Sequence, residues 1–288
     1  MNHVIAGRMA WLEGGQFSMG SERFYPEERP VRAASVAPYW IDETPVTNAD
    51  FARFVVHTGY RTLAEHMQEG MPSAGSAVFV RPAGEVDLAD PRQWWEFRAG
   101  ACWHAPLGAG SDLVGLEDHP VVHVAFADAV AYAAWCGKRL PSEAEWEFAA
   151  RGGLHGADFA WGNHLEPDGL VLANYWQGDF PSENTLKDGW ERTSPVRSFA
   201  ANGWGLHDMI GNVWEWTADA WSLPSSGAAP ARTCCAETRA GIDEQKVLKG
   251  GSHLCAANYC QRYRPAARHA QAAGETTSHI GFRCARSA

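Results

Sequence analysis

Turn residues that stand beside aromatic side chains recur through the middle of this 288-residue chain and limit the folds available to it. Glycine admits the positive φ angles of tight turns, and large aromatic side chains fill the space between short elements. We therefore expect an α+β domain with roughly half of its residues in loops, against a typical ~40%. The aromatic turn segments are Trp161-Gly162, Trp176-Gln177-Gly178, Gly189-Trp190 and Gly203-Trp204-Gly205.

Short helices and strands are predicted between these loops. Thr47 has the character of a helix N-cap, with Gly59 ending that helix. Ser142 and Glu145 match the capping box of a second helix, which Gly152-Gly153 would stop. A further helix is predicted at residues 128–136 before Gly137, a hairpin at 9–19 about Gly14-Gly15, and strands at 39–41, 121–124, 247–249 and 280–284.

Composition limits the domain organisation and the partners. No repeat or linker-like stretch appears, so we expect one domain over residues 1–288 with a core at about 9–286. The net charge of −10 argues against a nucleic-acid partner. No segment is long and apolar enough to cross a membrane, and the first ten residues lack a secretory pattern. We expect a cytoplasmic monomer without a membrane partner.

Two of the seven cysteines, Cys255 and Cys260, stand close together in sequence. At this spacing they would point to opposite faces of a strand, so the segment must bend to bring the sulfurs together. Gly250-Gly251 and Asn258 make an irregular backbone plausible. Two thiolates do not complete a structural zinc site, which needs four ligands. They suit Cu(I) or a redox-active disulfide, and a structural disulfide or two buried thiols is the alternative interpretation.

Oxygen-bearing loops are a second candidate site. Carboxylate, amide and backbone carbonyl oxygens on loops suit Ca²⁺, although loop carboxylates also cap turns. The candidate segments are Asn174-Tyr175, Asp188-Gly189-Trp190 and residues 210–215.

The remaining polar side chains suggest structural roles. The sequence contains no motif of a hydrolase or a nucleotide-binding loop. His123, His207, His253 and His279 lack metal-binding spacing, so we expect local hydrogen bonds for them. For Arg262, Arg264 and Arg268 we expect pairing with carboxylates rather than anion binding.

Four motifs in order resemble one family, the formylglycine-generating enzyme (sulfatase-modifying factor) superfamily. They are Gly-Lys-Arg-Leu-Pro-Ser-Glu-Ala-Glu-Trp-Glu (137–147), Gly-Asn-Val-Trp-Glu-Trp (211–216), Lys-Gly-Gly-Ser (249–252) and Gly-Phe-Arg-Cys (281–284). The resemblance runs from about Trp11 to the C-terminus. Cys-x4-Cys followed by Arg-Tyr-Arg-x-Ala-Ala-Arg is similar to the prokaryotic copper-dependent members. The implied fold is a single compact, loop-rich domain related to the C-type lectin fold.

The resemblance implies an oxidoreductase that acts on a sulfur group with O₂ as co-substrate. Its substrate would be an extended Cys-x-Pro-x-Arg segment of a sulfatase polypeptide, whose cysteine becomes Cα-formylglycine through a thioaldehyde that hydrolyses. Cys255 and Cys260 match the catalytic pair that holds Cu(I), with the substrate thiolate as third ligand. Ser252, Tyr259 and Trp216 match residues that line the site.

The resemblance also implies two structural Ca²⁺ sites. Tyr175, Trp190, Ile210, Gly211 and Val213 would contribute backbone carbonyls. The first site comprises Asn174, Tyr175, Asp188 and Trp190, and the second comprises Ile210, Gly211, Val213 and Glu215.

Some positions depart from the family pattern. Pro265 stands where lumenal eukaryotic relatives have a cysteine, which favours a reducing setting. Cys284 keeps the family position, but Ala133 replaces its usual partner and Cys136 lies one helical turn on, so a Cys136–Cys284 bridge is left open. Cys234-Cys235 have no counterpart.

Two alternative functions remain. A sulfoxide-synthase-like oxidase would need a His/His/Glu iron site, usually on an additional helical domain. A non-catalytic, lectin-like or peptide-binding member of the superfamily would bind without turnover.

Overall fold

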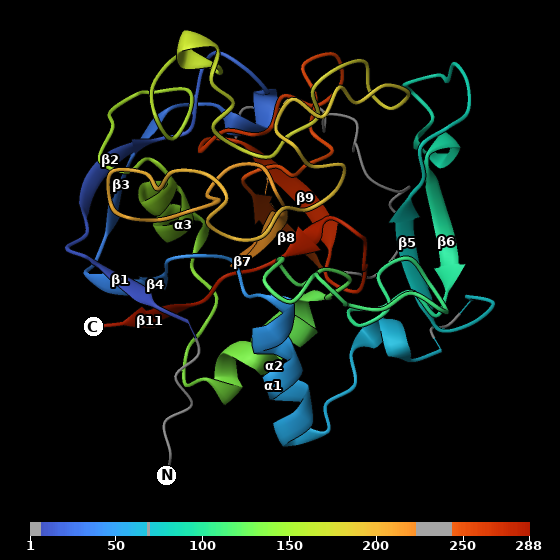
Figure 1. Ribbon diagram of the computed structural model, residues 1–288. Helices are drawn as coiled ribbons and strands as arrows, with labels where there is room; N and C mark the ends of the chain where they lie inside the picture. Colours follow the sequence, from blue (N-terminus) through green and yellow to red (C-terminus); the bar gives the residue numbers. More distant parts are fainter. Residues whose placement is uncertain (1–6, 68–69, 223–243) are drawn as a thin grey trace.

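Regular structure occupies short segments between long loops in the computed structural model, which describes residues 7–67, 70–222 and 244–288. The described residues form four small sheets and three α-helices (Figure 1). The strands are β1 (Met9–Leu12), β2 (Gly15–Met19), β3 (Arg32–Val36), β4 (Tyr39–Asp42), β5 (Gly75–Phe79), β6 (Trp95–Ala99), β7 (Trp214–Ala220), β8 (Gln245–Lys249), β9 (Arg268–Ala272), β10 (Ile280–Gly281) and β11 (Ala285–Ser287). The helices are α1 (Asn48–Thr58), α2 (Phe126–Trp135) and α3 (Glu143–Ala150). The predicted loop-rich α+β architecture is confirmed.

The central sheet has the strand order β10-β7-β8-β9. β10 runs parallel to β7, and the other two pairs are antiparallel. Three of the four sequence motifs contribute to this sheet, because β7, the end of β8 and β10 each contain motif residues. In Figure 1 this sheet lies at the centre, with α1 and α2 packed together beneath it.

The other strands pair around this centre. β1, β4 and β11 form a three-stranded sheet, β2 pairs with β3, and β5 pairs with β6. The hairpin predicted at residues 9–19 is wrong, because β1 pairs with β4 and β2 with β3. Gly14 does make the tight turn, with a φ of 71° and the Val36 carbonyl 2.3 Å from where a Cβ would stand.

Local signals placed the helices well. The Thr47 hydroxyl accepts from the Asp50 backbone N–H at 3.2 Å, and Gly59 ends α1 with a φ of 68°. The Ser142–Glu145 capping box begins α3 as predicted. α2 begins two residues earlier than predicted, because the Asp128 carboxylate accepts from the Ala125 N–H at 2.8 Å.

Two strand predictions need correction. Residues 121–124 form no strand, since His123 has a left-handed φ of 61° that breaks an extended run. Of the strand predicted at 280–284, only Ile280–Gly281 is a strand, β10, and the next strand, β11, begins at Ala285 and joins a different sheet. The strands at 39–41 and 247–249 are confirmed within β4 and β8.

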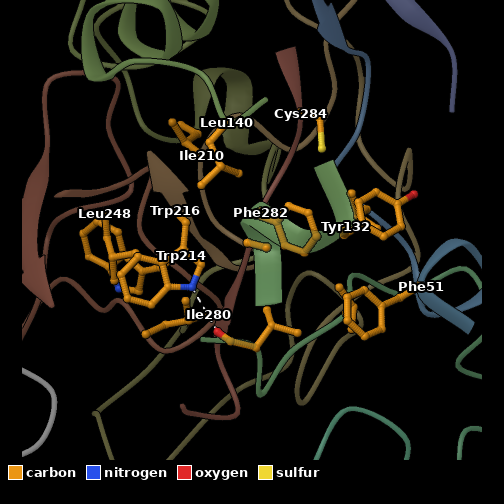
Figure 2. Close-up of a cluster of buried hydrophobic side chains, with 14 of the residues drawn as sticks. Phe51, Tyr132, Leu140, Ile210, Trp214, Trp216, Leu248, Ile280, Phe282 and Cys284 are labelled. Atoms are coloured by element: carbon orange, nitrogen blue, oxygen red, sulfur yellow. Dashed lines mark hydrogen bonds between the residues drawn. The ribbon is translucent and has the colours of Figure 1, made fainter. Parts of the chain in front are cut away.

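Aromatic side chains from the helices and the central sheet fill the core. Phe51 of α1 stacks on Tyr132 of α2 with ring centroids 5.7 Å apart, and Phe282 meets the edges of both rings. Figure 2 shows this group, together with Trp214 and Trp216 from β7. Burying rings of this size supplies much of the apolar area that a loop-rich chain needs.

Buried ion pairs join the four motifs to one another. Glu147 in α3 accepts from Lys249 at the end of β8 at 2.9 Å. Glu215 in β7 binds Arg283 through two hydrogen bonds of 2.7 and 2.8 Å. Burial raises the pKa of Glu147, but the Lys249 and Arg151 cations outweigh that effect and lower it. We call the two pairs Glu147–Lys249 and Glu215–Arg283 the motif frame.

Candidate active site

The cysteine pair lies on two consecutive turns that follow the Lys-Gly-Gly-Ser motif. The Cys255 N–H donates to the Ser252 carbonyl at 2.9 Å, and the Cys260 N–H donates to the Ala256 carbonyl at 2.9 Å. The Cys255 carbonyl in turn accepts from the Trp176 N–H at 2.9 Å. The predicted bend is therefore present, and a neighbouring loop fixes it.

Two glycines allow the chain to enter these turns. Gly250 and Gly251 have φ angles of 92° and 73°, which disfavour other residue types. A Cβ on Gly250 would stand 2.9 Å from the Trp146 ring, and one on Gly251 would stand 2.7 Å from the Arg262 carbonyl. Both the backbone conformation and the close packing therefore require glycine here.

The two sulfurs face each other at a separation of 3.3 Å. This exceeds the ~2.05 Å of a disulfide bond, so the pair is not bridged. Both side chains are buried, at 2% and 1% exposure. The Ser252 N–H donates to the Cys255 sulfur at 3.4 Å, and Arg262 Nη1 donates to the Cys260 sulfur at 3.8 Å.

A small cavity adjoins the sulfurs, and its free volume is about 10 Å³. That is roughly the room one water molecule needs. Ser252 and Tyr259, two of the residues named from the resemblance, line the cavity. The other lining residues are Trp94, Trp95, Phe180, Trp214, Leu254 and His279, besides the two cysteines.

Trp216 is not among the residues that line this cavity, and its role at the site stays a prediction from the resemblance. Its indole N–H donates to the Val124 carbonyl at 3.0 Å, and its ring meets the edge of Phe126. Trp214, two residues earlier on β7, lines the cavity instead. Both tryptophans belong to the buried cluster in Figure 2.

Sequence reasoning missed Trp94, Trp95 and Phe180 as site residues. Trp94 packs against Phe180 and Tyr259 at 5.5 Å, and Phe180 stacks on Tyr259 at 4.7 Å. The paired tryptophans were visible in the sequence, but only the packing of the β5–β6 hairpin brings them to the cysteines. Figure 1 shows this hairpin at the edge of the molecule.

The first predicted calcium set gathers several oxygens. The Gln177 side-chain amide donates both to the Tyr175 carbonyl and to the Asp188 carboxylate, so these oxygens are neighbours. The Trp190 N–H donates to Asp188 at 2.9 Å, and burial raises the pKa of that carboxyl. Asn174 Oδ1 is buried without a hydrogen-bond partner. A buried amide oxygen without a partner and a half-buried carboxylate are the kinds of ligand that a hard cation takes.

The second predicted calcium set includes a carboxylate that is already engaged. Glu215 is fully buried, and its two oxygens accept from Arg283 and from the Trp146 indole. A cation there would have to share these oxygens with a guanidinium group. Ile210, Gly211 and Val213, which would supply backbone carbonyl oxygens to the ion, precede Glu215 in the same segment. This set does not fit Ca²⁺, and the site stays a prediction from the resemblance alone.

Most other polar candidates have structural partners. His123, His207 and His253 each contact a backbone carbonyl at 2.8–2.9 Å, and His279 contacts the Thr277 hydroxyl at 2.8 Å. The expected arginine pairing is confirmed, since Arg262, Arg264 and Arg268 bind Glu27, Glu28 and Glu143. Cys136 and Cys284 are unbridged thiols, and Cys234-Cys235 lie outside the described residues.

Two observations concern metals and membranes. Within residues 7–67, 70–222 and 244–288, no group of three or more His, Cys, Asp or Glu side chains is placed to hold a metal ion. The same part of the chain has no helix that is long and apolar enough to span a membrane.

The fold and the site together define a loop-rich α+β domain that presents two adjacent buried thiols. Residues 3–288 match the sulfatase-modifying factor enzyme 1-like domain, and the chain belongs to that family. It is 52% identical to a formylglycine-generating enzyme of Mycobacterium tuberculosis over 286 residues, 95% of each chain. It is 44% identical to one from Thermomonospora curvata, covering 98% of this chain and 94% of the relative. Among solved structures, PvdO from Pseudomonas aeruginosa superposes with a TM-score of 0.64 at 25% identity, covering 98% of this chain and 95% of the other.

Proposed function

We propose that this protein oxidises a cysteine within a Cys-x-Pro-x-Arg segment of a sulfatase to Cα-formylglycine. Family membership supports the reaction class, because its similar relatives are formylglycine-generating enzymes. The observation that carries the proposal is the pair of buried sulfurs 3.3 Å apart at the motif position.

Cu(I) is the cofactor that suits this pair. Soft thiolate ligands select Cu(I), and two protein ligands leave a position for a third sulfur. Cys255 and Cys260 would hold the ion, because their sulfurs lie within reach of one atom. When bound, copper would supply the one-electron chemistry that lets a thiol react with O₂.

The surrounding residues position the sulfurs and exclude water. Arg262 orients the Cys260 sulfur through its Nη1, and Glu27 holds that guanidinium at 2.6 Å. The Ser252 N–H fixes the Cys255 sulfur. Aromatic rings form much of the cavity wall and leave room for about one water molecule, so bulk water is kept away. Holding the reacting sulfur beside fixed thiols in a dry site is proximity catalysis.

Calcium binding at the first loop set is part of the proposal. Asn174 and Asp188 would supply side-chain oxygens, and Tyr175 and Trp190 would supply carbonyls. The unpartnered Asn174 oxygen supports this assignment. The ion would stabilise the loop that contains Trp176, whose N–H donates to the Cys255 carbonyl.

The test is conversion of a Cys-Thr-Pro-Ser-Arg peptide by the purified chain with Cu(I) and O₂, followed by mass spectrometry. The expected result is replacement of the peptide thiol by an aldehyde, with no product when either copper or O₂ is withheld. Peptide binding without conversion would contradict the proposal and favour the non-catalytic peptide-binding alternative. Conversion at the full rate in the presence of a strong copper chelator would show that the reaction is correct but that copper is not required.

A further inference from the structure

Two tryptophans that line the cysteine cavity each have an indole N–H without a hydrogen-bond partner. Nε1 of Trp94 and Nε1 of Trp95 are both buried and unsatisfied. Both residues also line the cavity that holds Cys255 and Cys260. Buried donors are almost always paired in folded proteins, so two neighbouring unpaired ones need an explanation.

The local backbone explains how consecutive residues reach the same cavity. Side chains alternate between faces within a strand, but Trp94 precedes β6 and has φ and ψ of −135° and 1°. Its ring is held against Phe180 and Tyr259. The Trp95 ring lies 4.9 Å from the His279 ring. Both indoles are fixed in place by these ring contacts.

The chemistry of the cavity identifies what these groups would bind. An indole N–H only donates, so its partner must be an acceptor. The cavity lining includes no lysine or arginine, which disfavours an anion, and the free space suits a single small group. The cavity is lined by both cysteines, but it is too small to admit a peptide as it stands. The lining side chains must therefore move apart on binding, and a peptide whose cysteine then reaches the sulfurs brings its own backbone carbonyls to the tryptophans.

We propose that Trp94 and Trp95 form a substrate clamp, in which their indole N–H groups donate to backbone carbonyl oxygens next to the cysteine to be oxidised. The clamp rests on the proposed function and deepens it by assigning two substrate-binding residues. It recognises the main chain rather than a side chain. It therefore fixes the distance from the substrate sulfur to the Cys255 and Cys260 sulfurs.

The molecule contains a matched control for this clamp. Trp103 is a third buried tryptophan whose Nε1 has no partner, but it does not line the cysteine cavity. It packs against Phe51 at 5.3 Å and beside His104. Replacing Trp103 by phenylalanine removes the same N–H from a similar environment away from the site.

The first arm of the experiment measures binding without turnover. A fluorescein-labelled peptide with serine in place of the target cysteine is titrated into the full chain and followed by anisotropy. Trp94→Phe and Trp95→Phe should each weaken binding about 5- to 10-fold, as expected for one hydrogen bond. Trp103→Phe should leave the affinity unchanged. Equal affinity in the wild type and the Trp94→Phe/Trp95→Phe double variant would overturn the clamp.

The second arm uses the wild-type chain and needs no variant to fold. Peptides that carry a thioamide, a poor acceptor, at the cysteine or at either neighbouring residue should bind less tightly at one or two of these positions. The double variant should show no such loss. No thioamide effect in the wild type would overturn the clamp alone, if the normal peptide is still bound and converted. Absence of any peptide binding or conversion would overturn the proposed function as well.

Discussion

The motif frame and the cysteine cavity meet in one segment, in which Lys249 stands six residues before Cys255, yet their polar groups are in opposite states. In the frame, Glu215 accepts from Arg283 and Trp146, and Glu147 accepts from Lys249, Arg151 and the Gly20 N–H. In the cavity, two indole donors have no partner and two sulfurs face a small void. A satisfied buried network stabilises the fold, whereas unsatisfied donors that line a cavity together with reactive thiols are available to a ligand.

The comparison divides the family motifs by role. Glu147, Lys249, Glu215 and Arg283 hold separate segments together, while the cysteines of the following segment carry the proposed chemistry. Breaking the frame should therefore reduce stability strongly. Changing the cavity should reduce activity or binding with a small effect on stability.

The largest effect on stability is expected from Arg283→Met, which leaves the Glu215 carboxylate buried without its cation. Removing one partner of a buried pair costs about 3–5 kcal/mol. We expect the free energy of unfolding, measured by urea denaturation, to fall by that amount. Glu191→Gln removes an exposed partner of Arg81 and should change it by under about 1 kcal/mol. Equal effects of the two changes would contradict the structural role of the frame.

The second prediction concerns pH and the buried His123, which bonds to Ser76 and to the Pro106 carbonyl. Burial lowers the pKa of His123 from 6.5 to about 4. Between these values the unfolded chain binds more protons, so stability falls as pH falls. Between pH 7 and pH 5, the uptake of a proton by this residue in the unfolded chain should lower the free energy of unfolding by about 2 kcal/mol. His123→Asn suits the left-handed backbone and should remove that part of the pH dependence in urea unfolding.

A smaller effect is expected from calcium. At a free Ca²⁺ concentration ten times the dissociation constant, the wild type should gain about 1.4 kcal/mol of stability. Asn174→Ala should lose this gain, since it removes the unpartnered oxygen. Unfolding midpoints with Ca²⁺ and with a chelator provide the measurement. A calcium effect that survives in Asn174→Ala would place the ion elsewhere.

The smallest effect on stability is expected from the cavity itself. Cys255→Ala and Cys260→Ala each remove one sulfur from a site that already contains free space, and they should cost about 1 kcal/mol. A loss as large as that of Arg283→Met would show that the pair is mainly structural. Urea unfolding of Cys255→Ala, Cys260→Ala and Arg283→Met under the same conditions makes this comparison directly.

The sequence predicted those features that depend on nearby residues. The caps at Thr47 and Ser142 and the turns at Gly250-Gly251 are local, and the structure contains them. The bend between Cys255 and Cys260 followed from their spacing and from the glycines before them. The hairpin at 9–19 failed because the pairing partners β3 and β4 lie further along the chain.

The aromatic part of the site could not be predicted in the same way. Trp94 lines the same cavity as Cys260 because its ring packs against Phe180, 86 residues later, and Tyr259, 165 residues later. No periodicity encodes such a contact. The place of Trp214 at the cavity could not be predicted for a similar reason, since Trp214 and Trp216 occupy the same strand and differ only in their packing partners.

The most direct test of the central claim compares the wild type with two variants at equal concentrations of folded protein. Formylglycine formation in the Cys-Thr-Pro-Ser-Arg peptide is timed for the wild type, for Cys260→Ala and for Cys102→Ala, which alters a buried cysteine outside the cavity. The account predicts no product from Cys260→Ala and a wild-type rate from Cys102→Ala. Conversion by Cys260→Ala at the full wild-type rate would contradict it.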